Sequence, residues 1–382
     1  MKTILIINLL FCFAAAKDEF FEPGATIGGY GELHYNNETI GDADPTTKLD
    51  FHRWILFVNY NFTSEWSMKS ELEIEHNMID GSGDYKGEVE LEQAYINYHN
   101  ADGNWGYGAG VVLISVGIIN ERHEPPTFLS VERPSYNSKI IPTTWFGNGA
   151  HVYGSFGDFD AKFVLHEDMK GDSIGDGTGL RSGRAKGYES TADNWTMNFS
   201  GNYTGIEGLT LGGSITMNDS PRSDTTNPND DSIVTNRTVA WNLMEGHATY
   251  NTNNMMVVAE LGMISYDPSD GWNEATDNGD GTFTEGSSEY GGSMGYYMQA
   301  GYDISSLMDW EDSKLVPWFG MGMYDLDDTD DTDSVNTTQF GVTWWPTAKI
   351  SWKFDYTMDT KNSLTTNTVK TNTLSLGVGY MF

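Results

Sequence analysis

One segment of the sequence, residues 117–145, combines both charge signs with four of the chain's 11 prolines. Proline cannot donate a hydrogen bond to a sheet ladder, so we expect a stiff, ordered loop here rather than a strand. Ordered loops of this length inside a compact fold are usually functional. Opposed charges facing each other across water would select ions, although the same charges could instead form structural ion pairs within the loop. The candidate residues are Glu121, Arg122, His123, Glu124, Glu132, Arg133 and Lys139.

Several common signatures of catalysis are missing from the sequence. His123 and Glu124 are followed by Pro-Pro-Thr, so they do not form the His-Glu-x-x-His motif of zinc hydrolases. A phosphate-binding loop and a dinucleotide fingerprint are also absent from the sequence. We therefore predict that the protein is not an enzyme and has no cofactor and no metal site.

Two acidic segments, 277–281 and 325–333, are similar in composition to calcium-binding loops. An EF-hand needs acidic ligands before its glycine and a glutamate six residues after it. Neither Gly279 nor Gly281 satisfies this spacing in full. The simpler interpretation is a pair of solvated outer loops, whose charge could bind the divalent ions that bridge lipopolysaccharide.

The composition suits a membrane barrel better than a soluble enzyme. The chain has 382 residues with 43 glycines and 13% aromatic residues, but only 38% hydrophobic residues. A barrel with one face in lipid and one face in water needs this mixture. The formal net charge of −34 argues against nucleic acid as a partner, because phosphates need cations. Outside the N-terminus, no apolar run approaches the roughly 18 residues that a membrane helix needs.

The first 16 residues have the pattern of a secretory signal peptide. Met1 and Lys2 form a short positive region, residues 4–13 are apolar, and residues 14–16 are a small-residue cleavage site. Residues 17–382 are predicted to form a single outer-membrane barrel. The only cysteine, Cys12, lies within the signal, so we expect no disulfide in the mature protein.

Segments of about 10 to 14 residues with period-two alternation recur along the mature chain. There are 16 of them, and short connections alternate with long ones, as in bacterial outer-membrane barrels with short periplasmic turns and long outer loops. The predicted fold is therefore all-β, a closed transmembrane antiparallel barrel of 16 strands. The predicted strands are 24–36, 49–62, 65–77, 87–99, 104–116, 146–156, 158–167, 193–204, 206–217, 238–250, 253–266, 291–304, 314–325, 335–346, 347–358 and 369–382.

One predicted strand, 87–99, does not follow a single alternation. Glu88, Glu90 and Glu92 have the same parity as the apolar Ile96 further along the segment. Either a β-bulge interrupts the strand, or these glutamates stand above the lipid.

The two ends of the barrel must meet. A spanning sheet cannot leave an edge unpaired in hydrocarbon, so 24–36 is predicted to pair with 369–382. The last residues, with Gly377, Tyr380 and Phe382, match the C-terminal insertion signal of outer-membrane barrels. This match predicts the barrel assembly machinery as a partner.

Parity also assigns charged side chains to the inner face of the barrel. Simple wetting of the lumen explains any one of them, but as a set they are mixed in sign and lean acidic. This balance predicts a modest preference for cations. The predicted inner-wall residues are Arg53, Lys69, Glu71, Glu73, Glu75, Asp160, Lys162, Lys353 and Asp355.

Several stretches of the chain resemble one known family. Residues 28–35 (Gly-Gly-Tyr-Gly-Glu-Leu-His-Tyr), 50–53, 70–76, 88–95 and 117–145 are similar to the phosphate-selective porin O/P family of outer-membrane porins. The resemblance implies a 16-stranded barrel, usually trimeric, whose third outer loop folds into the pore as a constriction. That loop corresponds here to 117–145. The rows of arginine and lysine that line the family's anion-binding pores are not visible in this sequence.

The function predicted from these features is that of a porin in the bacterial outer membrane. It would let small hydrophilic solutes and ions diffuse passively, with a weak preference for cations. The alternatives are a structural or adhesive surface protein with a plugged lumen, and a phosphate- or anion-selective porin. The expected partners are outer-membrane lipid and lipopolysaccharide, small ions and solutes, and two further copies of the chain in a homotrimer.

Overall fold

The computed structural model describes residues 21–77, 87–175, 177–188, 190, 192–226, 233–268, 276–277, 283–284, 291–308, 310, 312–328, 334–362 and 368–382. The predicted signal peptide, 1–16, lies outside the described residues, as do most of the acidic segments 277–281 and 325–333. Among the described residues, no helix is long and apolar enough to cross a membrane.

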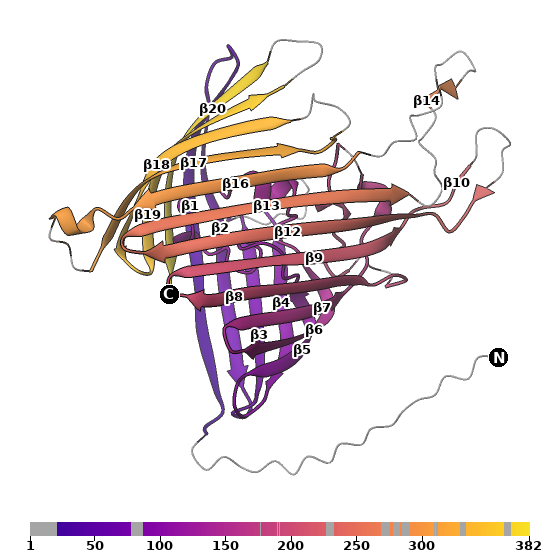
Figure 1. Cartoon of the computed structure of the whole chain (residues 1–382), viewed down its shortest axis with the longest axis horizontal. Coiled ribbons are helices and arrows are strands. Elements are labelled where there is room, and N and C mark those ends of the chain that lie inside the picture. Colours follow the sequence, from indigo (N-terminus) through magenta and orange to yellow (C-terminus); the bar gives the residue numbers. More distant parts are fainter. Residues whose placement is uncertain are drawn as a thin grey trace.

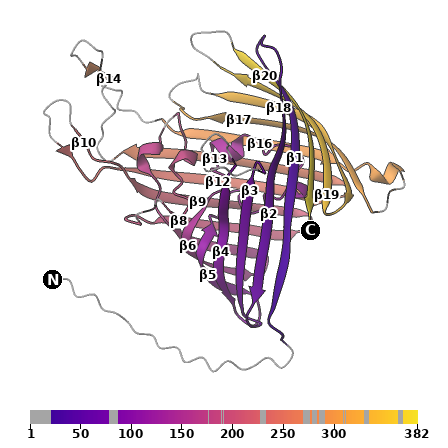
Figure 2. The same ribbon diagram turned by 180° about the vertical axis from the view of Figure 1, so that it is seen from behind.

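Sixteen antiparallel strands form one closed barrel (Figure 1). Strands on the near and far sides cross at a steep angle in Figures 1 and 2, because strands in a closed barrel are tilted from its axis. The strands are β1 (Gly24–Ile40), β2 (Thr46–Asn61), β3 (Trp66–Glu75), β4 (Val89–His99), β5 (Trp105–Leu113), β6 (Phe146–Phe156), β7 (Phe159–His166), β8 (Thr196–Ile206), β9 (Leu209–Pro221), β12 (Thr238–Thr252), β13 (Met255–Pro268), β16 (Ser293–Tyr302), β17 (Lys314–Asp325), β18 (Val335–Thr347), β19 (Ile350–Lys361) and β20 (Val369–Met381).

The structure confirms the predicted fold class and every predicted strand. The largest differences in strand bounds are the ends of β1, at Ile40, and of β9, at Pro221, each four residues beyond the predicted end. β1 is longer because β20 pairs with it as far as Thr371, opposite Ile40.

The predicted closure between the first and last strands is present. Tyr30 of β1 lies opposite Met381 of β20. The backbone N–H of Phe382 donates to the carbonyl oxygen of Gly29 at 2.9 Å, and Gly29 donates back at 3.2 Å. The C-terminal residue is therefore part of the seam.

The connections alternate in length around the barrel. Two-residue turns at 157–158, 207–208 and 253–254 lie at one end, and the connections 114–145 and 167–195 lie at the other. Short hairpins occur within the long connections (Figure 1): β10 (Thr225–Thr226) pairs with β11 (Ile233–Val234), and β14 (Thr276–Asp277) pairs with β15 (Phe283–Thr284).

The outer face of the barrel is apolar. In β16, for example, Met294, Tyr296 and Met298 are exposed, whereas Tyr297 and Gln299 between and beside them are buried. This alternation is the one that a sheet with a lipid face and a lumen face requires. Near the short turns, Trp66, Tyr98, Trp105 and Tyr107 pack against one another on neighbouring strands, as aromatic residues do at a membrane interface.

Two β-bulges lie within the first four strands. In β2, Arg53 pairs with Glu32 and Phe51 pairs with Leu33, so His52 is an extra residue. In β4, Gln93 pairs with Glu71 and Leu91 pairs with Leu72, so Glu92 is the extra residue. A bulge changes the direction of the side chains around it. The uncertain parity of 87–99 is therefore resolved in favour of a bulge, which turns the buried Glu92 to the lumen.

The connection 114–145, here called the inner loop, folds back inside the barrel, where Figure 1 shows its short helix α1 (Tyr136–Lys139) behind the strands. Ile140, Ile141 and Trp145 of the inner loop join an apolar core with Trp241 and Leu243 of β12. The rings of Trp145 and Trp241 are 5.9 Å apart. This part of the lumen is therefore a packed core rather than a wet surface.

Glycine permits this close approach. A Cβ on Gly262 of β13 would lie 2.6 Å from the Tyr136 hydroxyl, and one on Gly295 of β16 would lie 2.8 Å from Ile140. The inner loop can lie against these strands because neither position carries a side chain.

Candidate functional site

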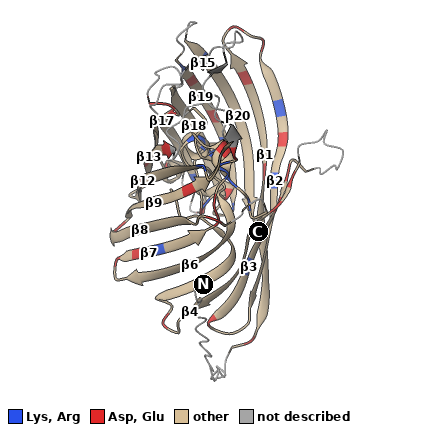
Figure 3. Ribbon diagram, turned by 90° about the vertical axis from the view of Figure 1, so that its right-hand side faces the viewer, with Lys and Arg blue, Asp and Glu red and all other residues tan. Residues whose placement is uncertain are grey.

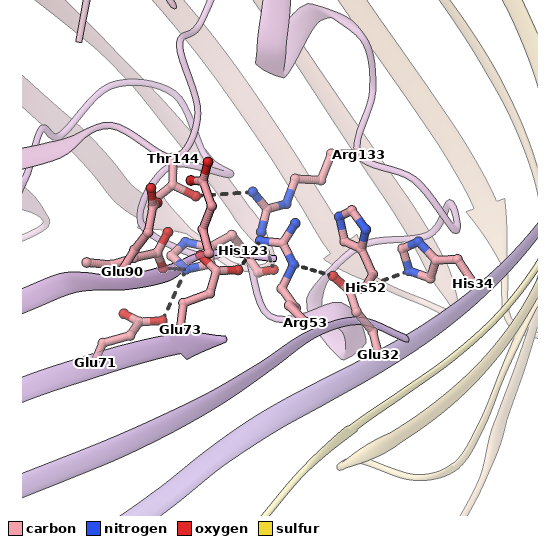
Figure 4. A network of polar contacts seen from close by, with 12 residues as sticks. Glu32, His34, His52, Arg53, Glu71, Glu73, Glu90, His123, Arg133 and Thr144 are labelled. Carbon is pink, nitrogen blue, oxygen red and sulfur yellow. Dashed lines mark hydrogen bonds and ion pairs between the residues drawn. The ribbon is translucent and has the colours of Figure 1, made fainter. Parts of the chain in front are cut away.

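Charged side chains gather on the lumen face of the first four strands, below the inner loop (Figure 4). Figure 3 shows residues of both charge signs on the chain that lies inside the barrel. We call the following set the charged network: Glu32 and His34 of β1, Arg53 of β2, Glu71 and Glu73 of β3, Glu92 of β4, and His123, Glu132 and Arg133 of the inner loop.

Arg53 links three adjacent strands. Its Nε lies 2.7 Å from Glu32 Oε1, and its Nη1 lies 3.2 Å from Glu73 Oε1. All three side chains are buried. The planar guanidinium has donors for a carboxylate on each side, which suits arginine to this position better than lysine.

His123 carries the contact between the inner loop and this wall. Its Nε2 lies 3.3 Å from Glu71 Oε1 and 3.4 Å from Glu92 Oε2, and its Nδ1 is 3.2 Å from the Asn120 carbonyl oxygen. Burial opposes the charged imidazole, but the hydrogen bonds and charges of Glu71 and Glu92 outweigh it and raise the pKa of His123 to about 10. At neutral pH, His123 is therefore a buried cation between two carboxylates.

Glu132 makes a second link between the inner loop and the wall. Its Oε1 accepts hydrogen bonds of 2.9 Å from His34 Nδ1 and from Asn36 Nδ2. Burial disfavours the carboxylate, but these two hydrogen bonds and the charge of His34 lower the pKa of Glu132 to about 2. Next to it, Arg133 donates to Thr144 Oγ1 at 3.2 Å within the inner loop, as Figure 4 shows.

The inner loop is also held by strands other than β1–β4. Lys353 of β19 donates to the Ser130 carbonyl oxygen at 2.7 Å, and the Val131 N–H donates to Asp355 of β19 at 2.6 Å. On β13, Glu260 accepts from the Ile118 N–H at 2.5 Å. β19 is separated from β1 only by β20, whereas β13 lies across the ring from β1–β4. The contact between Glu260 and Ile118 therefore stretches the inner loop across the lumen.

The seven loop residues identified from the sequence do not form one ring. His123, Glu132 and Arg133 belong to the charged network. Glu121 instead pairs with Lys162 of β7 at 2.6 Å, and Lys139 lies 5.9 Å from the ring centre of Tyr324. Of the remaining two residues, Arg122 lines a cavity. The carbonyl oxygen of Glu124 accepts a hydrogen bond from Thr127.

Cavities lie between the inner loop and the short turns, and two of them are lined by predicted loop residues. The first, about 360 Å³, is lined by Lys69, Glu121, Asp160 and Lys162 among others. The second, about 270 Å³, is lined by Arg122, Tyr250 and Met256 among others. Charges of both signs therefore line a polar space on one side of the loop. Glu75, which was also predicted to line the wall, is the last residue of β3, at the long-loop end of the barrel.

Sequence reasoning missed three members of the charged network. Glu32 and His34 share parity with the buried Tyr30, which could have identified them as inward-facing. Glu92 was ambiguous because the bulge reverses the parity of β4. Two groups of ligand atoms close enough for a cation lie at the network, Glu71–Glu92–His123 and Glu73–Glu90–Glu92. In both, a cation of the protein itself (His123, Arg53 or Lys186) already faces the carboxylates.

A closed barrel with an apolar outer face and a charged lumen, crossed by an inward-folded loop, defines a membrane-spanning barrel with the porin fold. Solved outer-membrane channels share this fold. An anion-selective porin from Comamonas acidovorans aligns with a TM-score of 0.60 at 12% identity, over 94% of this chain and 100% of that chain. The outer membrane channel DcaP of Acinetobacter baumannii aligns at 0.57 and 11% identity, over 94% and 97%. A trimer form of OmpT, an outer membrane protein of Vibrio cholerae, aligns at 0.56 and 11%, over 94% and 99%.

Sequence comparison reaches less of the chain. No family model matches it. An uncharacterized protein of Aquifex aeolicus (strain VF5) is 48% identical over 141 residues, which are 37% of this chain and 31% of that protein. The chain therefore matches about a third of the length of this relative. The porin fold that the sequence predicted is confirmed, and it supports the predicted location in the outer membrane.

Proposed function

We propose that the protein is an outer-membrane porin through which small hydrophilic solutes and ions diffuse passively. The observation that carries this proposal is the inner loop stretched across the lumen, with a cavity of about 360 Å³ beside it that is lined by Lys69, Glu121 and Lys162. Such a loop narrows the passage and lines it with fixed charges, which decide which ions pass. Of the seven predicted loop residues, His123, Glu132 and Arg133 would act in the charged network. Glu121 and Arg122 would act at the cavities.

The selectivity that we propose is a weak preference for cations. The charged network contains five carboxylates, against two arginines and two histidines. In the first cavity, Glu121 and Asp160 balance Lys69 and Lys162. A near balance that leans acidic favours cations only slightly. Membership of the phosphate-selective porin O/P family, and with it anion selectivity, is the alternative that the sequence resemblance and the anion-selective structural neighbour support.

A plugged barrel with a structural role is the second candidate, and the apolar core inside the lumen favours it. Trp145, Trp241 and Leu243 are almost fully buried there, although they lie on inward-facing positions. In this case the inner loop would be a plug, and the acidic outer loops would carry the function.

A homotrimer is part of the proposal. The trimer form of a structural neighbour supports it, and so does the aromatic cluster on the outer face of β3–β5, which a neighbouring subunit could cover as well as lipid. Lipopolysaccharide and the barrel assembly machinery remain proposed partners.

Conductance in a planar lipid bilayer tests the proposal. We expect discrete channels whose zero-current potential, under a potassium chloride gradient, has the sign of a weak cation preference. An absence of channels from folded protein would favour the plugged barrel. A strongly anion-selective potential, or block of chloride current by micromolar phosphate, would favour the anion-selective alternative.

A further inference from the structure

Three side chains that belong to no part of the proposed pore converge at the long-loop end of the lumen. They are Asp50 and His52 of β2 and His76, just after β3. His76 Nδ1 is 2.9 Å from Asp50 Oδ2, and His52 Nδ1 is 3.3 Å from the same oxygen. One ligand atom from each residue lies within 4.8 Å of the others. These side chains are 13–28% exposed, so the group is open to solvent on one side.

The bulge in β2 creates this convergence. Asp50 pairs with His34 and faces the lumen, and the next inward position in a regular ladder would be residue 52. Because His52 is the extra residue of the bulge, it and Arg53 both turn inward. Arg53 then enters the charged network, and His52 stays beside Asp50. The ring of His52 is stacked on His34, at 4.9 Å between centres, and Figure 4 shows this pair at the edge of the network.

His76 is held in place by its backbone. Its N–H donates to the His52 carbonyl oxygen at 3.0 Å, which fixes it beside β2. Its φ of 54° lies in the left-handed region, which few residues other than glycine adopt. Such backbone conformations concentrate at ligand sites, where the surrounding structure maintains them. Here the conformation directs the imidazole at Asp50.

Two imidazoles and one carboxylate are the donor set of a transition metal. Zn²⁺, Ni²⁺, Cu²⁺ and Fe²⁺ bind imidazole nitrogen well, whereas Ca²⁺ and Mg²⁺ take oxygen ligands. Three protein ligands leave a coordination position open to water or solute. The nearest cation, Lys48, contacts Asp50 at 2.9 Å but is 64% exposed, so it can move away when a metal ion binds.

We propose that Asp50, His52 and His76 form a binding site for one divalent transition metal ion at the long-loop mouth of the lumen. The site lies next to the charged network through the stacked pair of His34 and His52. A bound ion would add two positive charges beside the passage, so solutes entering from this end would meet it first. The site does not depend on an open pore, and its test is therefore separate from the test of the channel.

The test uses the full chain without an affinity tag, folded in detergent, with Zn²⁺ as the probe. We expect one Zn²⁺ per chain in a competition titration with a coloured chelator. We expect about tenfold or more weaker Zn²⁺ binding in each of the variants Asp50→Asn, His52→Gln and His76→Gln. Removal of a metal ligand should lower the metal affinity at least as much as removal of a residue that hydrogen-bonds to a ligand. His99→Gln is the matched control, since His99 lies at the opposite end of the barrel beside Asn100. It should bind Zn²⁺ as the unaltered chain does.

Heat-modifiable migration checks the folding of each variant. If a substitution prevents folding, X-ray absorption of Zn²⁺ bound to the unaltered protein decides instead, since two imidazoles must appear among the ligands. A stoichiometry near zero, fewer than two imidazoles, or equal losses in His99→Gln and His76→Gln would each overturn the proposal.

Discussion

His123 of the inner loop and Glu71 of β3 form a buried ion pair, with His123 Nε2 3.3 Å from Glu71 Oε1. The two residues are 52 positions apart in sequence, and both side chains are almost completely buried. This contact, shared with Glu92, fixes one side of the inner loop to the wall from which the charged network is built.

Removal of the His123 charge should loosen the inner loop. His123→Gln leaves Glu71 and Glu92 as buried carboxylates without a cation between them, and breaking a buried pair typically costs about 3–5 kcal/mol. We expect a lower free energy of unfolding in urea and a noisier single-channel current. Glu124→Gln serves as the control, because Glu124 uses only its backbone carbonyl in the contact described. Equal stability of the two variants would contradict this account.

The same ion pair predicts the response to alkaline pH. The groups around His123 are Glu71, Glu92 and Tyr30 on the wall and Arg133 on the inner loop. The pKa of His123 is raised to about 10 from about 6.5 in an unfolded chain. Its contribution to stability is therefore complete below pH 6.5 and is lost as the pH rises through about 10. We therefore expect the noise of the single-channel current to increase near pH 10. A current of the unaltered chain that stays steady up to pH 11 would contradict this prediction.

Glu121 is expected to contribute to the selectivity of the channel. Glu121→Gln removes the partner of Lys162 and leaves an unpaired cation in the larger cavity. Combined with Glu124→Gln, it should move the zero-current potential toward anion preference. Glu65→Gln, in a short turn outside both cavities, is the matched control and should leave the potential unchanged. An unchanged potential in the double variant would remove Glu121 from the selectivity mechanism.

Phe382 should be needed for membrane insertion. Its backbone makes two hydrogen bonds with Gly29 across the seam, and it ends the predicted insertion signal. Deletion of Phe382 should therefore reduce the amount of heat-modifiable protein in the outer membrane. Phe382→Tyr keeps the aromatic ring and the backbone, and it should insert normally. Normal levels of the deleted chain would refute this role.

Gly262 offers a test of the plugged barrel. A Cβ there would meet the Tyr136 hydroxyl at 2.6 Å, so Gly262→Ala should push α1 away from β13. If the inner loop obstructs the lumen, conductance should rise. Gly246→Ala is the control, because nothing lies within 4 Å of a Cβ at that position. Equal conductance of both variants would indicate that contact between Tyr136 and β13 does not limit flow.

Much of the fold could be predicted because period-two alternation and connection length are local properties of the sequence. The interior of the barrel was harder to predict from the sequence. Val239, Trp241 and Leu243 alternate in β12 as lipid-facing residues would, yet they face inward and pack on the inner loop. These residues alternate with outward-facing ones such as Met244, and the alternation would be the same if the lipid face and the lumen face were exchanged. Only the position of the inner loop, which is a long-range property, decides which face is in lipid.

The candidate site was predicted in part for a similar reason. Arg53, Glu71 and Glu73 were placed in the lumen from parity, and the structure puts them there. The directions of His52 and Glu92 depend on bulges, and a bulge depends on how two strands fit rather than on either strand alone. The metal site proposed here contains one of these residues, which explains why the sequence predicted no metal.

The two bulges also determine how this barrel can change in evolution. Arg53 and Phe51 pair with the consecutive residues Glu32 and Leu33. Deletion of His52 would therefore leave a regular ladder in which all of these pairs between β1 and β2 are kept. The same holds for Glu92 between Leu91 and Gln93. Loss or gain of a single codon could therefore remove or add a lumen side chain without reversing the faces of the rest of the strand. His52 and Glu92 are separable additions to a barrel that would close without them.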